Sequence, residues 1–197
     1  SNIIEKFKDL IGNQIVLTKE WNKLPHTKGW RYGKGSALAV LKPGKLTQIW
    51  KILEICVESD LIVIMQAANT GLTGGSTPFG SDYDRPIVII NTMRIKDIHI
   101  IKEGSQIVGL TGSTLYGLEK KLKPYGREPH SIIGSTSIGA SIIGGICNNA
   151  GGSLVQRGPS YTEMALYARI SKTGKLELVN ELGINLGSRQ VYESCQA

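Results

Sequence analysis

The sequence predicts an α+β fold, with a parallel strand–helix–strand unit near its start and antiparallel hairpins in its second half. Two short apolar runs, 37–42 and 61–65, flank a segment whose apolar residues recur at helical spacing, as in a βαβ unit. Turn signals at Glu103-Gly104 and at 172–175 each separate two strand-like runs, which indicates hairpins. At 197 residues, with 41% apolar and 20% charged residues, the chain is long enough for one large domain or for two lobes.

An amphipathic helix is predicted over 3–11, because apolar residues recur there at helical spacing and Gly12 follows as a stop signal. Ser1 and Asn2 are given no role. From 15 to 35 the chain is polar and irregular, so we expect a long loop. Three aromatic residues of this loop either anchor it, which is the commoner use, or cover a cofactor: Trp21, Trp30 and Tyr32.

Three strands and one helix are predicted next. The strand over 37–42 and the strand over 61–65 should be parallel, since a helix connects them. A third apolar strand covers 87–90. The connecting helix has Lys45 where a Ser or Asp cap is expected, and its apolar face is formed by Leu46, Ile49, Trp50, Leu53, Cys56 and Val57.

Two hairpins are predicted in the second half, one pairing 95–101 with 106–110 and the other pairing 166–171 with 176–179. Between the hairpins a helix is predicted, which Ser113 or Thr114 can cap. Its apolar residues are Leu115, Leu118 and Leu122. Pro124 and Gly126 end it.

The net charge of +7 suits nucleic acid, an acidic membrane surface or an anionic cofactor. The positive residues are scattered, with no run longer than Lys120-Lys121, and only 6% of residues are aromatic, so we predict no nucleic-acid partner. The cysteines form no zinc or CxxC pattern, which favours a reduced, intracellular protein, and no metal site is predicted. No apolar run approaches the roughly 20 residues of a membrane span.

A glycine-rich stretch over 134–152 is the strongest functional signal. Seven of the 25 residues from Gly134 to Gly158 are glycine, and short neutral side chains such as Ser141 and Asn148 lie between them. Bare amides and neutral donors bind pyrophosphate groups well, which predicts the floor of a nucleotide-cofactor site. The alternative is a set of tightly packed turns in an ordinary scaffold.

A second loop rich in Gly, Thr and Ser covers 66–76 and follows the strand over 61–65, where parallel sheets bind ligands. It lacks the Gly-Lys-Ser/Thr ending of a Walker A loop, and no GxGxxG opens a helix after a strand. We therefore expect two glycine-rich loops, about 60 residues apart in the sequence, to converge on one phosphate-bearing ligand.

Several single residues remain open between a functional and a structural role. His130 could touch the ligand, although a histidine bonded to loop backbone is more common. Cys147 could attach a flavin or sense redox state, although a small buried cysteine is more common. Arg157 could neutralise a pyrophosphate or reach a carboxylate, and a solvated loop arginine is about as common. No carboxylate pair or Ser–His–Asp set has catalytic spacing. Two roles stay open for three charged residues, which could bind a ribose or bridge loops: Asp82, Asp84 and Arg85.

Three segments together resemble one flavoprotein family: 65–78 (MQAANTGLTGGSTP), 122–131 (LKPYGREPHS) and 138–158, which contains GGICNN. They resemble the FAD-binding domain of the bacterial respiratory, quinone-dependent D-lactate dehydrogenases, within the wider vanillyl-alcohol-oxidase class. The likeness runs from about Gly33 to Gly187. It implies a two-lobed α+β fold of the p-cresol methylhydroxylase type (PCMH-type), with a small parallel βαβ lobe, a larger mixed-sheet lobe and FAD between them.

The resemblance also implies which residues contact FAD. The first loop would bind the pyrophosphate, and the glycine-rich stretch would add three contacts. The residues so implied are Ala67, Ala68, Asn69, Thr70, Gly71, Gly75 and Ser76, together with Gly134, Ser141 and Gly151. Many members of the wider class bond flavin covalently through a histidine in the first loop. Since 72–75 offers none, non-covalent FAD is expected. The catalytic residues are not identified.

By resemblance, the parent protein would oxidise D-lactate to pyruvate, with hydride transfer to FAD and onward electron transfer to quinone. It would lie peripherally on the cytoplasmic side of the bacterial inner membrane. A dehydrogenase or oxidase for another 2-hydroxy acid is an alternative. A non-catalytic anion-binding module is a second alternative.

The expected domain organisation is an N-terminal helix and loop over 1–35, a FAD-binding domain over 36–187, and an end segment over 188–197. The FAD-binding domain would divide into lobes of about 36–93 and 94–187. Because the family's enzymes are far longer, we expect the chain to be an N-terminal part that lacks the substrate and membrane domains and is inactive alone.

Overall fold

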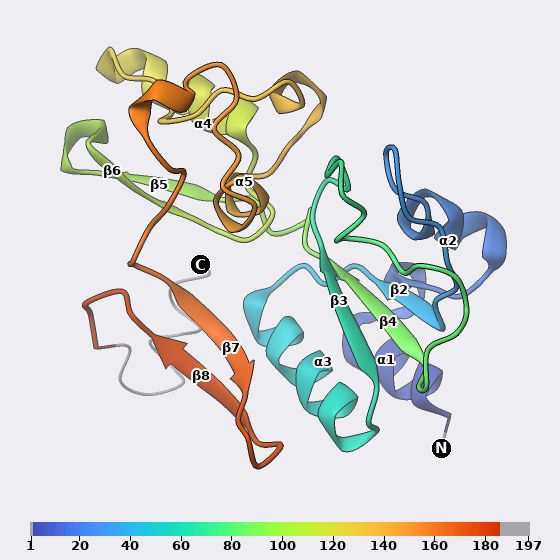
Figure 1. The fold of residues 1–197 in the computed structure, drawn as a ribbon. Helices are drawn as coiled ribbons and strands as arrows, with labels where there is room; N and C mark the ends of the chain where they lie inside the picture. The colour runs from blue at the N-terminus through green and yellow to red at the C-terminus, as the bar shows by residue number, and fades with distance from the viewer. Residues whose placement is uncertain (1, 186–197) are drawn as a thin grey trace.

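The computed structural model describes residues 2–185 and shows two lobes (Figure 1). The first lobe is a sheet with helices packed on it, and the second is a hairpin with two helices. A last hairpin, β7 (Leu166–Ile170) with β8 (Leu176–Asn180), contacts α3 (Leu46–Glu58) through β8. The predicted α+β fold with two lobes and the predicted C-terminal hairpin are confirmed.

The sheet of the first lobe has the strand order β1-β2-β4-β3. β2, β4 and β3 are parallel, and β1 is antiparallel to β2. The two strands of the predicted βαβ unit are therefore parallel, but β4 lies between them. The remaining elements of this lobe are α1 (Ile3–Ile11), β1 (Val16–Leu17), α2 (Glu20–Thr27), β2 (Ala39–Leu41), β3 (Ile62–Gln66) and β4 (Ile87–Asn91), with a 3₁₀ turn at Asn13–Ile15.

The central strand β4 is buried along its whole length. Its alternate side chains face opposite sides of the sheet, as the twofold repeat of a strand requires. Val88 and Ile90 join the core formed with α1 and α3, whereas Ile87 and Ile89 belong to a separate cluster with residues of β2. A parallel strand covered on both faces needs a continuous apolar run, and this one is IVII.

Helix α1 confirms the predicted range and has a cap that the sequence analysis set aside. The Asn2 Oδ1 accepts a hydrogen bond from the Ile4 N–H at 3.1 Å, so Asn2 is the N-cap. Gly12 ends the helix with a φ of 95°. Phe7 is fully buried and places α1 in the core of the first lobe.

The predicted loop over 15–35 is wrong in part, because it contains β1 and the helix α2. Helix α2 has no apolar stripe and carries Pro25 near its end. A buried lysine ties this helix to the rest of the lobe: the Lys23 Nζ donates to the Ala37 carbonyl oxygen at 2.6 Å and lies 2.7 Å from the Glu20 carboxylate. Contacts of this kind leave no periodic signal in the sequence.

The second lobe is built from a confirmed hairpin and a confirmed helix. Thr114 caps the helix, since its Oγ1 accepts from the Gly117 N–H at 3.0 Å. The leucines of this helix pack with Ile98 and Ile142 in a separate small core. The elements are β5 (Ile98–Ile101), β6 (Gln106–Gly109), α4 (Leu115–Leu122) and α5 (Ile142–Cys147), with 3₁₀ turns at Lys102–Gly104, Lys123–Tyr125, Thr136–Ile138 and Val155–Arg157.

The predicted end segment over 188–197 lies outside the described residues. Within residues 2–185, no helix has the length and apolar character needed to cross a bilayer.

Candidate cofactor site

The first glycine-rich loop begins at the carboxyl end of β3, where the side chain of Gln66 closes its base. Gln66 is only 2% exposed. Its Oε1 accepts from Asn91 Nδ2 at 3.1 Å and from His26 Nδ1 at 2.9 Å, and its Nε2 donates to the carbonyl oxygens of His26 at 2.9 Å and Ser76 at 2.8 Å. All four hydrogen-bonding positions of the amide are filled. The start of the loop is thereby tied to its end.

This network also fixes the tautomer of His26. Because the Gln66 Oε1 can only accept, the proton of the neutral imidazole lies on Nδ1. Burial lowers the pKa of His26, against the opposing effect of its hydrogen bond to Gln66. A neutral histidine therefore braces the loop from α2.

Asn69 closes the loop a second time. Its backbone is left-handed, with a φ of 56°. Its Oδ1 accepts from the Ser76 Oγ at 2.8 Å, and its Nδ2 donates to the Lys28 carbonyl oxygen at 2.8 Å and to that of Pro25 at 3.3 Å. Asn69 and Ser76, both expected to contact the cofactor, thus also shape the loop that would bind it.

Between these braces the backbone amides of the loop are free. Within the described residues, no N–H of residues 68–76 donates a hydrogen bond. The tip of the loop is exposed at Gly71, Leu72, Thr73 and Gly75. A loop that is braced by side-chain hydrogen bonds and has an exposed tip with unused N–H groups has the chemistry of an anion site.

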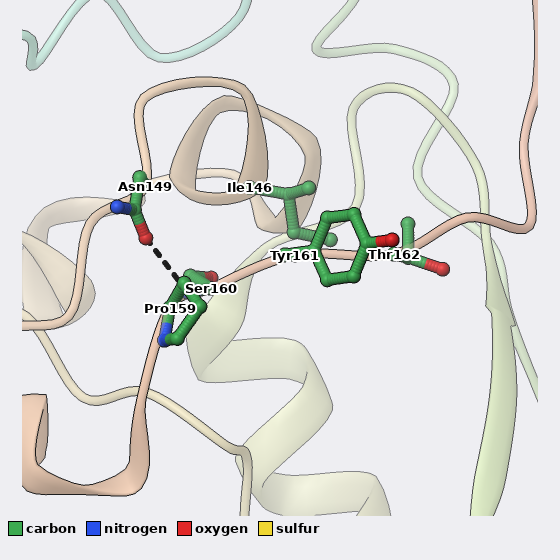
Figure 2. A pocket seen from close by; sticks show the side chains of 6 residues that line it. All are labelled: Ile146, Asn149, Pro159, Ser160, Tyr161 and Thr162. Atoms are coloured by element: carbon green, nitrogen blue, oxygen red, sulfur yellow. Dashed lines mark hydrogen bonds between the residues drawn. The ribbon is translucent and has the colours of Figure 1, made fainter.

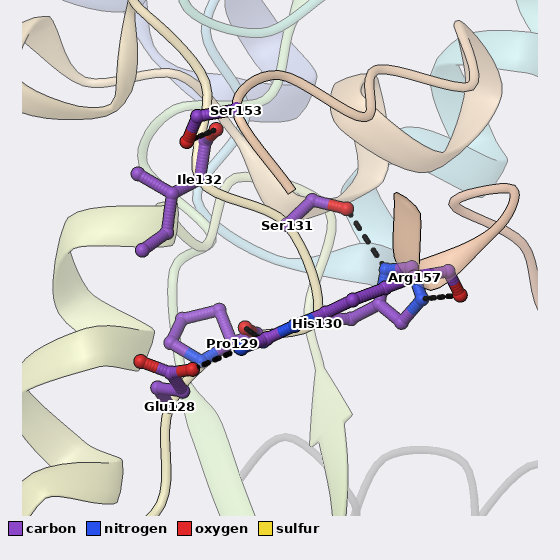
Figure 3. A network of polar contacts seen from close by, with 7 residues as sticks. All are labelled: Glu128, Pro129, His130, Ser131, Ile132, Ser153 and Arg157. Carbon is purple, nitrogen blue, oxygen red and sulfur yellow. Dashed lines mark hydrogen bonds and ion pairs between the residues drawn. The ribbon is translucent and has the colours of Figure 1, made fainter. Parts of the chain in front are cut away.

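The second glycine-rich segment is closed where its two ends pair (Figure 3). Ile132 forms a parallel bridge with Gly152, and the Ser153 N–H donates to the Ile132 carbonyl oxygen at 3.1 Å. Glycine is required at 152, because its φ is 59° and a Cβ there would lie 1.9 Å from the Ile132 carbonyl oxygen.

Arg157 connects the chain after this segment to the chain before it (Figure 3). Its guanidinium pairs with the Glu128 carboxylate and donates from Nη1 to the Pro129 carbonyl oxygen at 3.3 Å. The Arg157 carbonyl oxygen accepts from His130 Nε2 at 3.3 Å, and the Ser131 Oγ donates to His130 Nδ1 at 2.9 Å. The structural role expected for His130 is confirmed. Of the alternatives for Arg157, pairing with a carboxylate is the one observed, and the carboxylate is that of Glu128.

Ser141 links the second segment to the rest of the lobe. It is 4% exposed, and its Oγ caps α5 by accepting from the Gly144 N–H at 2.9 Å. Ser141 also forms an antiparallel bridge with Thr114, in which the Ile142 N–H donates to the Ser113 carbonyl oxygen at 2.9 Å. The residue expected to touch the cofactor is therefore the point where α5 begins.

Two features are shared by three of the described glycines, Gly71, Gly75 and Gly134. None has a positive φ, and no atom lies within 4 Å of the position that a Cβ would occupy. Gly151 differs, because its Cβ would lie 3.3 Å from the Val155 Cα. The open space over Gly71, Gly75 and Gly134 is where a ligand could approach the backbone closely.

A shallow hollow of about 450 Å³ lies on the second lobe (Figure 2). Residues of the second segment and the chain after it line the hollow, and the Asn149 Oδ1 accepts from the Ser160 N–H at 2.8 Å across its edge. None of the residues implied in FAD contact lines it. The lining residues are Ile146, Asn149, Pro159, Ser160, Tyr161 and Thr162.

Comparison with known proteins decides the family. The family model described as "FAD binding domain" matches residues 37–176. The chain belongs to the FAD-binding domain family.

Relatives of this FAD-binding domain include two bacterial enzymes named quinone-dependent D-lactate dehydrogenase. The one from Haemophilus influenzae is 59% identical over 185 residues, covering 94% of this chain and 33% of the relative. The one from Escherichia coli is 60% identical over 178 residues, covering 90% and 31%. The chain thus spans about a third of the length of these relatives. The mitochondrial D-2-hydroxyglutarate dehydrogenase of Arabidopsis thaliana is 30% identical over 186 residues, covering 92% and 32%.

Solved structures show the same fold. An alkyldihydroxyacetonephosphate synthase superimposes with a TM-score of 0.75 at 15% identity, covering 93% of this chain and 36% of that one. A p-cresol methylhydroxylase superimposes with a TM-score of 0.67 at 16% identity, covering 96% and 37%. The predicted PCMH-type fold and the prediction of FAD as cofactor are confirmed.

Other predictions about the FAD-binding domain are corrected. Cys147 is exposed, so its interpretation as a small buried cysteine is wrong. Trp21, Trp30 and Tyr32 are 73%, 62% and 68% exposed, so they do not anchor their loop by burial. For Arg85 the bridging alternative is observed, since its guanidinium pairs with the carboxylates of Asp60 and Asp84 at 2.8 and 3.3 Å.

Sequence analysis missed the polar residues that hold the first loop, Gln66 and Asn91. A signal for them exists: each is a polar residue that ends an otherwise apolar strand, and the two strands are parallel. Gln66 and Asn91 are paired in register. Because carboxyl ends of parallel strands meet at one edge of the sheet, this pattern predicts a polar pair beneath a ligand-binding loop.

Proposed function

We propose that this chain is the FAD-binding part of a quinone-dependent D-lactate dehydrogenase, which oxidises D-lactate to pyruvate and passes the electrons to quinone. The observation that carries the proposal is sequence identity of 52–60% with three bacterial enzymes of that name, over 90–94% of this chain. Since the chain spans about a third of those enzymes, we expect it to be inactive on lactate by itself.

The residues present fit FAD. The free N–H groups of 68–76 would donate to its diphosphate, and the space over Gly71, Gly75 and Gly134 would admit it close to the backbone. Ala67, Ala68, Thr70, Ser141 and Gly151 complete the proposed contact set. The chemistry that FAD supplies when bound is acceptance of a hydride from the α-carbon of the substrate. The role of the chain is to hold that group non-covalently in one position, since 72–75 contains no histidine.

A second candidate is oxidation of another D-2-hydroxy acid. It is favoured by the 30% identity with the Arabidopsis D-2-hydroxyglutarate dehydrogenase over 92% of this chain. The first candidate is favoured by 60% identity with the Escherichia coli enzyme, which is twice that value.

We also propose a peripheral location on the cytoplasmic side of a bacterial inner membrane. Two observations support it: the relatives are named for a quinone acceptor, and the chain has a net charge of +7, which suits an anionic lipid surface.

The test begins with FAD titration of the purified chain and of the whole protein that contains it. Both should acquire a flavin absorption spectrum, and an intact site should gain about 2.7 kcal/mol of stability at a free FAD concentration of 100 Kd. In the whole protein, D-lactate should bleach the bound flavin without oxygen, and a soluble quinone should restore the colour. A colourless whole protein whose melting temperature does not change when FAD is added would refute the proposal.

Substrate identity is tested with the same reduction assay. D-lactate, L-lactate, glycolate and D-2-hydroxyglutarate are compared by the rate of flavin bleaching. Faster reduction by D-2-hydroxyglutarate than by D-lactate would replace the first candidate with the second.

A further inference from the structure

We infer that Thr92 is a positioning residue that fixes the two glycine-rich segments relative to each other and so sets the affinity for FAD. The inference rests on the proposed function, because FAD is the ligand that both segments would share. Thr92 follows the last residue of β4 and belongs to neither segment. It is 4% exposed, and its N–H and Oγ1 are both used in hydrogen bonds to backbone carbonyl oxygens of this chain.

Thr92 holds the residue at which the first loop starts. Its N–H donates to the Gln66 carbonyl oxygen at 2.8 Å. Its Oγ1 lies 3.3 Å from that same oxygen and 3.3 Å from the Thr111 carbonyl oxygen. A hydroxyl has one proton, so the two carbonyl oxygens share it. One buried hydroxyl therefore joins the end of β3 to the turn between β6 and α4 of the second lobe.

The turn that includes Thr111 is packed directly on Thr92. The Gly112 N–H donates to the Ile95 carbonyl oxygen at 2.6 Å. A Cβ on Gly112 would lie 2.0 Å from the Thr92 carbonyl oxygen, so no other residue fits at this distance. The next residue, Ser113, accepts from the Ile142 N–H at 2.9 Å, in the first turn of α5. Thr92 is thus linked to both segments through short hydrogen-bonded connections.

This connection matters for binding because FAD would use donors from both lobes. If the spacing between the two sets of donors changes, the affinity for FAD falls even when each loop is intact. Binding sites depend on supporting residues to hold this geometry. A buried hydroxyl shared between two backbone carbonyls is such a support, and low local dielectric strengthens it.

The test compares Thr92→Val, which keeps the shape and removes the hydroxyl, with Thr92→Ser, which keeps the hydroxyl. Ile52→Val is the matched control, because Ile52 is a fully buried residue of α3 and its core cluster contains no residue of either segment. In the whole protein, FAD affinity is measured by titration, visible circular dichroism reports the surroundings of the bound flavin, and melting without FAD reports stability.

Thr92→Val should bind FAD about tenfold more weakly, the factor that corresponds to one hydrogen bond, and should change the flavin dichroism. Thr92→Ser should stay within about threefold of wild type. Ile52→Val should lower the melting temperature and leave both FAD readouts unchanged. Wild-type affinity in Thr92→Val, or an equal loss of affinity in Ile52→Val, would overturn the inference alone. Wild-type protein that does not bind FAD would overturn the proposed function as well.

Discussion

At the scale of single residues, glycines in this chain serve two different needs. Gly152 is glycine because its φ is positive and backbone lies against it, whereas Gly71 has neither constraint. A glycine that the fold does not need is costly, because it increases the entropy of the unfolded chain. The presence of Gly71 therefore indicates a role in ligand binding, and FAD would fit the open space over Gly71.

This distinction predicts effects of opposite sign for Gly71→Ala. Without FAD the variant should be more stable by about 0.4–1 kcal/mol in chemical denaturation, because alanine restricts the unfolded chain. FAD affinity should fall by about tenfold or more, because the new methyl group enters the ligand's space. Gly44→Ala is the control: its Cβ would meet only the flexible end of Arg94, at 3.3 Å, and FAD affinity should be unchanged. Unchanged affinity in Gly71→Ala would remove Gly71 from the site.

Cys56 supplies a prediction on pH. Burial raises the pKa of the Cys56 thiol to about 12, from about 8.5 in an unfolded chain. Between these values the unfolded state has lost a proton that the folded state keeps, so stability falls as the pH rises. The slope from this group is about 1.4 kcal/mol per pH unit. The advantage of wild type over Cys56→Ala in urea denaturation should therefore shrink above about pH 9. A constant difference would contradict the shift.

At the scale of elements, the segments between helices and strands determine how the site is assembled. The turn around Gly112 packs against the end of β4, and the bridge between Thr114 and Ser141 attaches the second glycine-rich segment to the start of α4. The hydrogen bonds of the bridge are made by Leu115, Ala140 and Ile142, whose side chains belong to the core of the second lobe. Backbone hydrogen bonds and apolar packing therefore act together in positioning α4 and α5.

Gly112→Ala should accordingly be strongly destabilising. Its Cβ would overlap the Thr92 carbonyl oxygen, so backbone must move, at a cost on the order of 3 kcal/mol. Gly145→Ala is the contrasting variant, because its Cβ would meet only a Leu115 methyl group at 4.0 Å within α5. That variant should gain about 0.5–1 kcal/mol from helix propensity. Equal stability of the two variants in urea denaturation would refute the close packing of Gly112 on the Thr92 carbonyl oxygen.

At the scale of the whole molecule, the two lobes have separate cores of different size. The first lobe buries Phe7, Ile52 and Ile90 with many neighbours, whereas the second buries a smaller set around Leu118. The less extensive core should open first in native-state fluctuations. A ligand held between the lobes would stabilise the second lobe in particular.

Hydrogen exchange tests this expectation. With FAD added, amide protection should rise together at 68–76 and at 132–153, because one ligand would contact both segments. Protection of β4, at the centre of the larger core, should change least. Protection that rises in only one of the two segments would show that they do not share a ligand.

The sequence by itself determined the helices and strands that bury an apolar stripe, the hairpins with clear turn residues, and the two glycine-rich segments that mark the family. Only the tertiary structure decided that 20–27 is a helix, that Gln66 and Asn69 close the first loop, and that Ser141 caps α5. The physical reason is the range of the interactions. Periodicity records burial along one element, whereas the Gln66 amide and the Thr92 hydroxyl join residues that are brought together only when the chain has folded.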